Sequence, residues 1–186
     1  MNALSKAGSG LAMFAMGYLI WLLLATSAPL NLATWALWLT IDFAVMLSLH
    51  RAKKPYELMA VFTVGTAVIV LISAYNLMAG KTPFVWGNAE TFTVVAVVIA
   101  LIIWKFTNDT VGVIVTTLSM VVAGVPTWID AYRAPELQSV LFWTLSGGAC
   151  YLTYLGTPKF FVARFMPLSG IFANGLILTL SLRQYL

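Results

Sequence analysis

The sequence predicts an all-α polytopic membrane protein with seven transmembrane helices, and two observations lead to that prediction. Apolar residues make up 61% of the 186-residue chain and charged residues only 9%. A soluble domain carries about 25% charged residues, so this chain has too few polar residues to cover a core in water. The second observation is a series of seven apolar stretches, each close to the roughly 20 residues that a helix needs to cross the hydrocarbon core.

The first three stretches are bounded by helix-breaking or basic residues. The first spans residues 10–28 and stops before Pro29. The second spans 31–50 and stops at the basic run 51–54, and the third spans 57–79 and stops before a Gly-Lys-Thr-Pro turn. Proline disfavours continuation of a helix and basic residues stay at the membrane surface, so both mark helix ends.

The remaining four stretches follow with connections of only a few residues. They span 89–106, 109–132, 137–157 and 160–182. Short connections make successive helices antiparallel neighbours, and no linker or soluble domain interrupts them. We therefore predict a single membrane domain.

The first stretch has a second interpretation as a cleaved signal peptide, because Lys6 precedes it and small residues occupy positions 26–28. Its apolar run is longer than a usual signal core, and Pro29 would directly follow the cleavage site, which is a poor context for cleavage. We therefore expect this segment to be retained as a transmembrane helix.

Positive charges predict the orientation, because cytoplasmic loops retain Lys and Arg. With seven crossings, the side of the N-terminus carries Lys6, Arg51, Lys53, Lys54, Lys105, Lys159 and Arg164, and the opposite side carries Lys81, Arg133 and Arg183. We therefore predict an inner (cell) membrane protein with its N-terminus in the cytoplasm and its C-terminus outside. The net charge of +4 then reflects topology, and no nucleic-acid partner is needed to explain it.

Two similar segments lie about 106 residues apart. Gly17-Tyr-Leu-Ile-Trp21 matches Gly124-Val-Pro-Thr-Trp128, Ala28-Pro29 matches Ala134-Pro135, and Trp38 matches Trp143. The first helix then corresponds to the fifth, so we predict parallel triple-helix units over residues 8–80 and 108–186, joined by a connector helix over 88–106. A chance match is the alternative, because glycine, tryptophan and Ala-Pro pairs recur easily in so biased a composition.

One segment carries a resemblance to a known family. It reads Gly124-Val-Pro126-Thr127-Trp-Ile-Asp130-Ala-Tyr-Arg133-Ala-Pro135-Glu136, with Trp143 after it and Thr34-Trp35 early in the second span. This pattern resembles the PQ-loop superfamily, which includes SWEET-type sugar facilitators and the vitamin transporters for nicotinamide riboside. The resemblance implies a three-plus-one-plus-three fold and transport of a small solute. Thr127 stands in place of the family's glutamine, Leu19 stands where the first repeat would carry proline, and the orientation is similar to that of the vitamin transporters.

Pro126 interrupts the fifth span. Inside a helix, proline removes one backbone hydrogen bond and kinks the segment. In a carrier, such a kink serves as a hinge for alternating exposure of a site at the membrane midplane. The alternative is a static kink that only shapes packing, since proline is common in membrane helices.

Asp42 lies near the middle of the second span, where an ionisable side chain costs at least about 2.5–3.5 kcal/mol. Trp35 and Trp38 precede it at spacings that place all three side chains on one helix face. Two indoles beside a carboxylate suit a flat, cationic or hydrogen-bonding solute. A substrate contact, a proton relay and a structural hydrogen bond to a neighbouring helix are three open roles for Asp42.

Four further residues complete the predicted substrate site. Asn76 in the third span and Asn174 in the seventh are similar to the asparagine pair that lines the pocket of the sugar facilitators. Trp128 and Trp143 are expected to face the space between the two triple-helix units. Hydrogen bonding between helices is the alternative role for Asn174.

Catalytic and cofactor chemistry is not predicted. The chain has one His and one Cys, His50 and Cys150, and it shows no paired carboxylates, metal-ligand spacing, phosphate loop or nucleophile motif. A retinal protein would need a lysine inside its last helix, and residues 166–182 contain none. We expect no enzyme activity, no metal and no cofactor.

Two hypotheses of function follow. The first is a carrier or facilitator for a small polar metabolite of vitamin-like or sugar-like kind, with aromatic or cationic character. The second is a non-transporting membrane subunit, receptor or scaffold that uses the same fold, because a fold does not fix function. The lipid bilayer surrounds the protein in both, and a homo-oligomer or a membrane-protein partner is left open.

Overall fold

The computed structural model describes residues 2–26 and 30–186, and within these ranges the chain forms helices and no β-strand. The long helices are α1 (Ala3–Thr26), α2 (Leu32–Arg51), α3 (Glu57–Met78), α4 (Asn88–Lys105), α5 (Asp109–Ala123), α7 (Val140–Gly156) and α8 (Phe161–Ser181). A short helix α6 (Val125–Arg133) continues α5, and two 3₁₀ turns, η1 (Pro135–Leu137) and η2 (Leu182–Tyr185), follow α6 and α8. Residues 27–29, on which the Ala28-Pro29 match and the cleavage-site interpretation depend, lie outside the described residues.

Helix length and composition support a membrane location. Across the described ranges, six segments are long and apolar enough to cross a bilayer: α1, α2, α3, α4, α8 with its terminal turn, and the rod of α5 and α6 over Asp109–Arg133. The helix α7 has 17 residues and is slightly shorter than these six. The all-α class is therefore confirmed, and the helices are compatible with a polytopic membrane protein.

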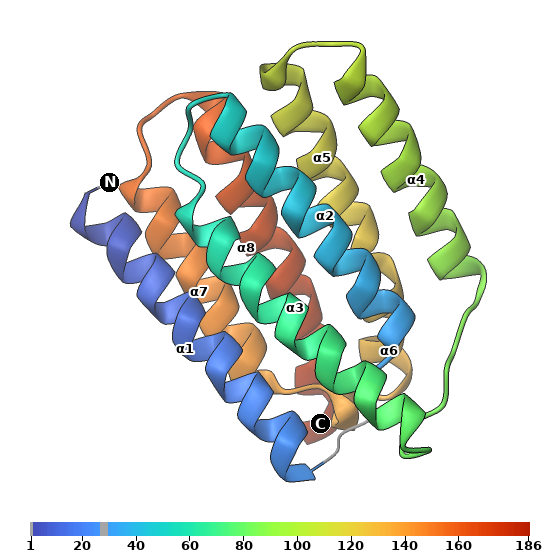
Figure 1. Ribbon diagram of the computed structural model, residues 1–186. Coiled ribbons are helices and arrows are strands. Elements are labelled where there is room, and N and C mark those ends of the chain that lie inside the picture. The colour runs from blue at the N-terminus through green and yellow to red at the C-terminus, as the bar shows by residue number, and fades with distance from the viewer. Residues whose placement is uncertain (1, 27–29) are drawn as a thin grey trace.

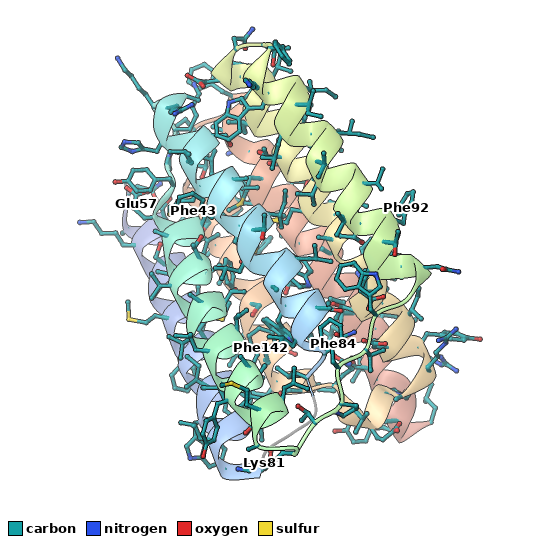
Figure 2. All side chains as sticks on the ribbon, turned by 45° about the vertical axis from the view of Figure 1, so that its right-hand side comes forward. Phe43, Glu57, Lys81, Phe84, Phe92 and Phe142 are labelled. Atoms are coloured by element: carbon teal, nitrogen blue, oxygen red, sulfur yellow. The ribbon has the colours of Figure 1, made fainter. Side chains whose placement is uncertain are left out.

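The outer surface of the bundle is strongly apolar. Met13, Leu24, Leu71 and Phe92 are each between 60% and 70% exposed, and Figure 2 shows Phe92 pointing away from the bundle while Phe142 lies inside it. Soluble monomers rarely expose contiguous apolar surface on this scale. The surface is suited to contact with lipid tails.

Polar caps fix where three of the helices begin. The side-chain oxygen of Asn31 accepts a hydrogen bond from a backbone N–H in the first turn of α2, at 3.0 Å. Asn108 does the same for α5 at 3.0 Å, and Ser139 for α7 at 3.2 Å. The first N–H groups of a helix have no partner within the helix, so these caps satisfy groups that would be costly to leave unpaired next to lipid.

Within the described residues, six helical segments form a ring in which each packs against two neighbours, and α4 lies outside the ring at the edge of the bundle. The order around the ring is α1, α3, α2, the α5–α6 rod, α8 and α7, and α7 packs against α1 again (Figure 1). The helix α4 packs on α5 and α2. The interior of the protein lies inside this ring.

The helix α1 begins earlier than the sequence indicated, at Ala3 instead of residue 10. Its first turns contain small residues that pack against α7. A Cβ atom added at Gly8 would lie 2.7 Å from the backbone oxygen of Ala149, and one added at Gly156 would lie 2.5 Å from the backbone nitrogen of Ser5. The apolar pattern did not indicate these turns, because they consist mostly of polar and small residues, of which Ser5 and Gly8 are buried.

Two prolines lie within the helices, and one of them lies at a break. The α5–α6 rod breaks at Gly124, and Pro126 lies in the first turn of α6, where it has no N–H to donate to the preceding turn. The sequence predicted an interruption at Pro126. Pro167 lies inside α8, which continues as one helix from Phe161 to Ser181, and the sequence did not indicate a role for it.

Candidate functional site

A cavity of about 60 Å³ lies in the interior of the ring of helices. The helix α2 contributes Trp35, Trp38 and Asp42 to its wall. Trp143 of α7 and Asn174 of α8 line the same space. The structure therefore brings five of the predicted site residues together around one space, although they come from three helices.

Among the described residues, Asp42 is the only carboxylate that lines the cavity, and no Lys, Arg or His lines it. Its side chain is 4% exposed, and its Oδ2 atom accepts a hydrogen bond from the Thr66 hydroxyl of α3 at 3.0 Å. This bond to a neighbouring helix is the contact that a structural role requires. A buried carboxylate is costly unless a cation or a proton neutralises it, so either a cation in the cavity or a proton on Asp42 would stabilise it.

Two of the tryptophans are held by hydrogen bonds at their indole nitrogens. Trp38 Nε1 donates to the Thr127 hydroxyl at 3.2 Å, and Trp143 Nε1 donates to Gln138 Oε1 at 3.2 Å. Thr127 directly follows Pro126, so the first bond ties α2 to the first turn of α6. The rings are therefore oriented by the protein before any ligand binds.

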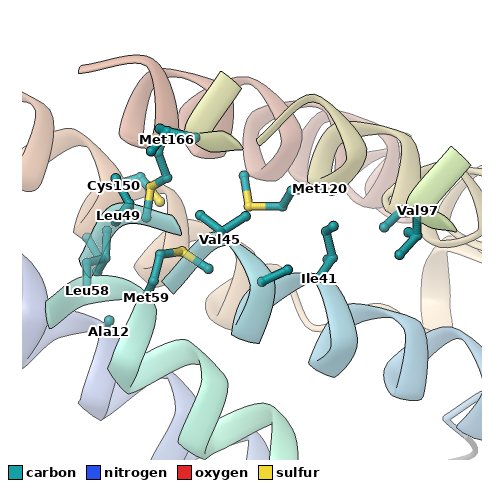
Figure 3. Packing of buried hydrophobic residues seen from close by; sticks show 14 residues of the cluster. Ala12, Ile41, Val45, Leu49, Leu58, Met59, Val97, Met120, Cys150 and Met166 are labelled. Carbon is teal, nitrogen blue, oxygen red and sulfur yellow. The ribbon is translucent and has the colours of Figure 1, made fainter. Parts of the chain in front are cut away.

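The apolar part of the wall is rich in sulfur. Met16, Met59, Met120, Met166 and Cys150 come from α1, α3, α5, α8 and α7. Figure 3 shows the last four around one part of the core, together with Val45 of α2. Methionine is flexible and polarisable and adapts to irregular shapes, so this wall can change its contour without strain.

A second, larger cavity of about 240 Å³ lies toward the end of the bundle opposite the N-terminus. We call it the vestibule. It is lined by Asn31 and Thr34 at the start of α2, by Asp130 and Arg133 at the end of α6, and by Thr82, Pro83 and Val85. Its wall is thus more polar than that of the central cavity.

Three aromatic residues separate the vestibule from the central cavity. Trp35, Phe142 and Trp143 line both spaces. The ring centroids of Trp35 and Phe142 are 6.4 Å apart, and those of Phe142 and Trp143 are 4.7 Å apart. This aromatic layer is packed, with exposed fractions of 9%, 3% and 7%, so it closes the central cavity on the vestibule side.

Two predicted site residues do not join the cavity. Asn76 is 5% exposed near the end of α3 and lines neither the cavity nor the vestibule. Trp128 packs its ring edge-on against Phe172 of α8, with centroids 6.1 Å apart, and close to Gly124. Within the described part of the chain, its buried indole nitrogen has no hydrogen-bond partner.

Three polar residues at the cavity or at the rim of the vestibule were not predicted as site residues from the sequence. Thr66 bonds to Asp42, and Ser146 lines the cavity with a buried hydroxyl that has no partner among the described residues. Helical spacing would have placed Ser146 beside Trp143, three residues earlier in α7. The third is Glu90, whose relation to α2 only the tertiary structure reveals.

Glu90 joins the start of α4 to the start of α2. It is 6% exposed; Oε1 accepts hydrogen bonds from Asn31 Nδ2 at 2.9 Å and from the Thr34 hydroxyl at 3.3 Å. Its other oxygen accepts from the backbone N–H of Gly87 at 2.9 Å. A buried carboxylate with three donors is well satisfied, so Glu90 serves to hold the rim of the vestibule together.

Neither a group of metal ligands nor a known relative gives further information on the function. In residues 2–26 and 30–186, no three His, Cys, Asp or Glu side chains come together in a way that could hold a metal ion. No protein-family model, curated protein or solved structure matches the chain. The cavity and the residues around it are therefore the features that bear on function.

Proposed function

We propose that this protein is a membrane carrier for a small polar metabolite. The observation that carries the proposal is the central cavity, with an uncompensated carboxylate and three tryptophans, inside the ring of helices. Substrate sites of carriers built from repeats lie at the interface between those repeats. Intramembrane carboxylates facing such cavities mark substrate or ion pathways.

The helix contacts support two parallel repeats. Exchanging α1 with the α5–α6 rod, α2 with α7 and α3 with α8 maps the α1–α7 contact onto the α5–α2 contact, and it maps α3 between its neighbours onto α8 between its neighbours. Trp38 and Trp143, which match in the sequence, both line the central cavity. We therefore propose seven crossings arranged three-plus-one-plus-three, with α4 as the connector and α7 as the shortest span, within the usual lower limit of about 17 residues.

The two ends of the bundle support the proposed orientation. The end that holds the N-terminus also holds the α2–α3, α4–α5 and α7–α8 connections (Figure 1), where most of the basic residues lie. By the positive-inside rule this end faces the cytoplasm. The vestibule then faces outward, and the aromatic layer is the barrier that closes the site on that side.

The cavity volumes support a closed conformation for the proposed carrier. Sites for drug-sized ligands are typically about 300–1,000 Å³, and the central cavity is about 60 Å³. Entry of a vitamin-sized or sugar-sized substrate therefore requires the aromatic layer to move. The Gly124–Pro126 break, bonded to Trp38 through Thr127, is the proposed hinge, and it agrees with the PQ-loop resemblance.

Uptake into proteoliposomes tests the proposal. A panel of vitamins, nucleosides, sugars and amines is first screened for thermal stabilisation of the purified protein, and the solutes that stabilise it are then tested for uptake. We expect Asp42→Asn to reduce uptake by about tenfold or more, because one hydrogen bond to a charged group contributes roughly 1.5–3 kcal/mol. Asp109→Asn is the matched control, since Asp109 lies at the start of α5 and bonds to Trp104 at 3.3 Å, away from the cavity.

The absence of both stabilisation and uptake for every solute of the panel would contradict a carrier. Equal uptake by wild type and Asp42→Asn would keep the carrier and remove Asp42 from its substrate site. A stable complex with another membrane protein in mild detergent, together with the first result, would favour a non-transporting subunit, receptor or scaffold.

A further inference from the structure

The donors around the central cavity are largely used within the protein. The Thr66 hydroxyl donates to Asp42, and the indole N–H groups of Trp38 and Trp143 donate to Thr127 and Gln138. Asn174 donates from Nδ2 to the backbone oxygen of Gly170 at 2.7 Å. The backbone oxygen of Gly170 can accept a hydrogen bond only from the NH₂ group of the Asn174 amide. This bond therefore determines the orientation of the amide, and Oδ1 of Asn174 points away from Gly170.

The polar atoms that are left over are mainly acceptors. Within the described chain, Asp42 Oδ1 and Asn174 Oδ1 receive no hydrogen bond. Ser146 is 1% exposed, and its hydroxyl, which can donate or accept, has no partner there. Trp35 keeps a free indole N–H, but its ring lies in the layer shared with the vestibule. The cavity therefore offers one carboxylate group and at least two further sites to a ligand that donates hydrogen bonds.

The size of the cavity limits the ligand that this closed conformation can hold, without movement of the aromatic layer. A water molecule occupies roughly 10–15 Å³ of volume measured in this way, so about 60 Å³ holds roughly four to six non-hydrogen atoms. Apart from the polar group, the wall consists of aromatic and sulfur-containing side chains such as Met59, Phe62 and Met120. A short apolar chain fits against them.

We infer that the cavity binds a small primary monoamine in its protonated form, with the ammonium group on Asp42 and the alkyl chain against the methionines. This inference rests on the proposed function only in taking the cavity as the substrate site. A quaternary ammonium has the charge but no N–H to donate, and an alcohol donates without the charge. A diamine brings a second charge for which the wall has no second carboxylate, and an anion is repelled by Asp42.

Three ligands with the same number of non-hydrogen atoms distinguish the need for a positive charge from the need for a hydrogen-bond donor. They are n-butylamine, tetramethylammonium and 1-butanol, and their affinities for the wild-type protein in lipid nanodiscs are compared by titration calorimetry against empty nanodiscs. We expect n-butylamine to bind about ten- to hundredfold more tightly than each of the others, which is the range expected for one hydrogen bond to a charged group. Equal affinity for n-butylamine and either of the other ligands would overturn the inference, and so would an absence of n-butylamine binding.

Single-residue variants test whether n-butylamine binds at Asp42 and Ser146. We expect Asp42→Asn to weaken n-butylamine binding at least tenfold and Ser146→Ala to weaken it several-fold. Ser48→Ala is the control and should keep wild-type affinity, because Ser48 of α2 is fully buried but bonds to Thr116 and does not line the cavity. Unchanged binding in Asp42→Asn would overturn the assignment, and if that variant does not fold, the wild-type ligand series decides alone.

The inference and the carrier proposal fail in different ways. Binding of n-butylamine through Asp42 without any uptake would keep the amine site and remove the carrier. Uptake of another solute that depends on Asp42, without amine binding, would keep the carrier and remove the amine.

Discussion

At the scale of single residues, the site depends on side chains of α2 that bond to other helices. Asp42 bonds to Thr66 of α3, and Trp38 bonds to Thr127 of α6. The second bond joins α2 to the short helix that follows the break at Gly124. Through this bond, the orientation of Trp38 in the cavity and the position of α6 depend on each other.

A double-mutant cycle measures this dependence. We expect Trp38→Phe and Thr127→Val to show a coupling of about 0.5–1.5 kcal/mol in unfolding free energy, because the bond is largely shielded from water. The control is the bond between Trp86 and Thr91, which is also an indole-to-hydroxyl bond, at 3.0 Å, but lies in an exposed region. Its coupling should be smaller, and an equal or larger value in the control pair would contradict the expectation.

Residue positions were predictable where helical spacing alone decides them. The spacing of Trp35, Trp38 and Asp42 placed them on one face, and the three side chains line one cavity. The directions of Asn76 and Trp128 were not predictable, because they depend on how each helix is rotated about its axis. In lipid both the core side and the outer side of a helix are apolar, so the sequence carries little information on that rotation.

At the scale of helices, close packing depends on small residues. Gly8 allows α1 to approach α7 so closely that an added Cβ would lie 2.7 Å from a backbone oxygen of α7. Gly10 lies on the same helix with nothing within 4 Å of an added Cβ. Small residues at interfaces let membrane helices pack through dispersion contacts, since lipid removes most of the hydrophobic driving force.

The pair of glycines gives a matched test of this packing. We expect Gly8→Ala to destabilise the protein by about 1–3 kcal/mol, because the backbone of α7 cannot move aside as a flexible side chain could. Gly10→Ala should be neutral or stabilising by up to about 1 kcal/mol, from the higher helix propensity of alanine. Unfolding of the purified variants in mixed micelles measures both, and equal stabilities would show that α1 does not need this approach.

The break between α5 and α6 makes a prediction about rate. Pro126→Ala restores a backbone donor in the first turn of α6 and should straighten and stiffen the rod. For a solute that the wild type carries, we expect a several-fold lower uptake rate with the binding affinity changed less than about twofold. Pro158→Ala, in the connection between α7 and α8, should leave the rate unchanged. A Pro126→Ala variant with the wild-type rate would show that the kink is static.

Helix positions were more predictable than helix ends and breaks. Proline and basic residues marked the ends of α2 and α3 close to where they occur. The early start of α1 was missed because its first turns pack on α7, and such contacts between distant segments leave no periodic signal. Pro167 was readable in the sequence, but nothing local distinguishes it from other prolines in membrane helices.

At the scale of the whole molecule, the two ends of the bundle differ in the number of basic residues. The end that holds the N-terminus carries the connections with Arg51, Lys53, Lys105 and Lys159, and Lys81 follows α3 at the opposite end. Figure 2 also shows Lys81 and Glu57 at opposite ends. Composition and hydropathy predicted the long apolar helices that the structure contains. The number of crossings and the two units of three helices stay predictions.

Cysteine labelling tests the orientation. The native Cys150 is 2% exposed and should not react with a membrane-impermeant maleimide. We expect Lys81→Cys to be labelled in intact cells and Lys53→Cys to be labelled only after the membrane is permeabilised. The wild type reports any background reaction of Cys150, and the reverse pattern would place the N-terminus outside.

The tryptophans of the cavity make the protein its own optical reporter. Trp35, Trp38 and Trp143, three of the seven tryptophans, line the central cavity. Indole emission responds to local polarity, so wetting of the cavity would shift the emitted wavelength without any attached dye. Trp38 is also bonded to the turn that follows Gly124, so rotation of α6 would change the environment of a chromophore. Replacement of the four tryptophans outside the cavity by phenylalanine would leave a signal that comes from the cavity alone.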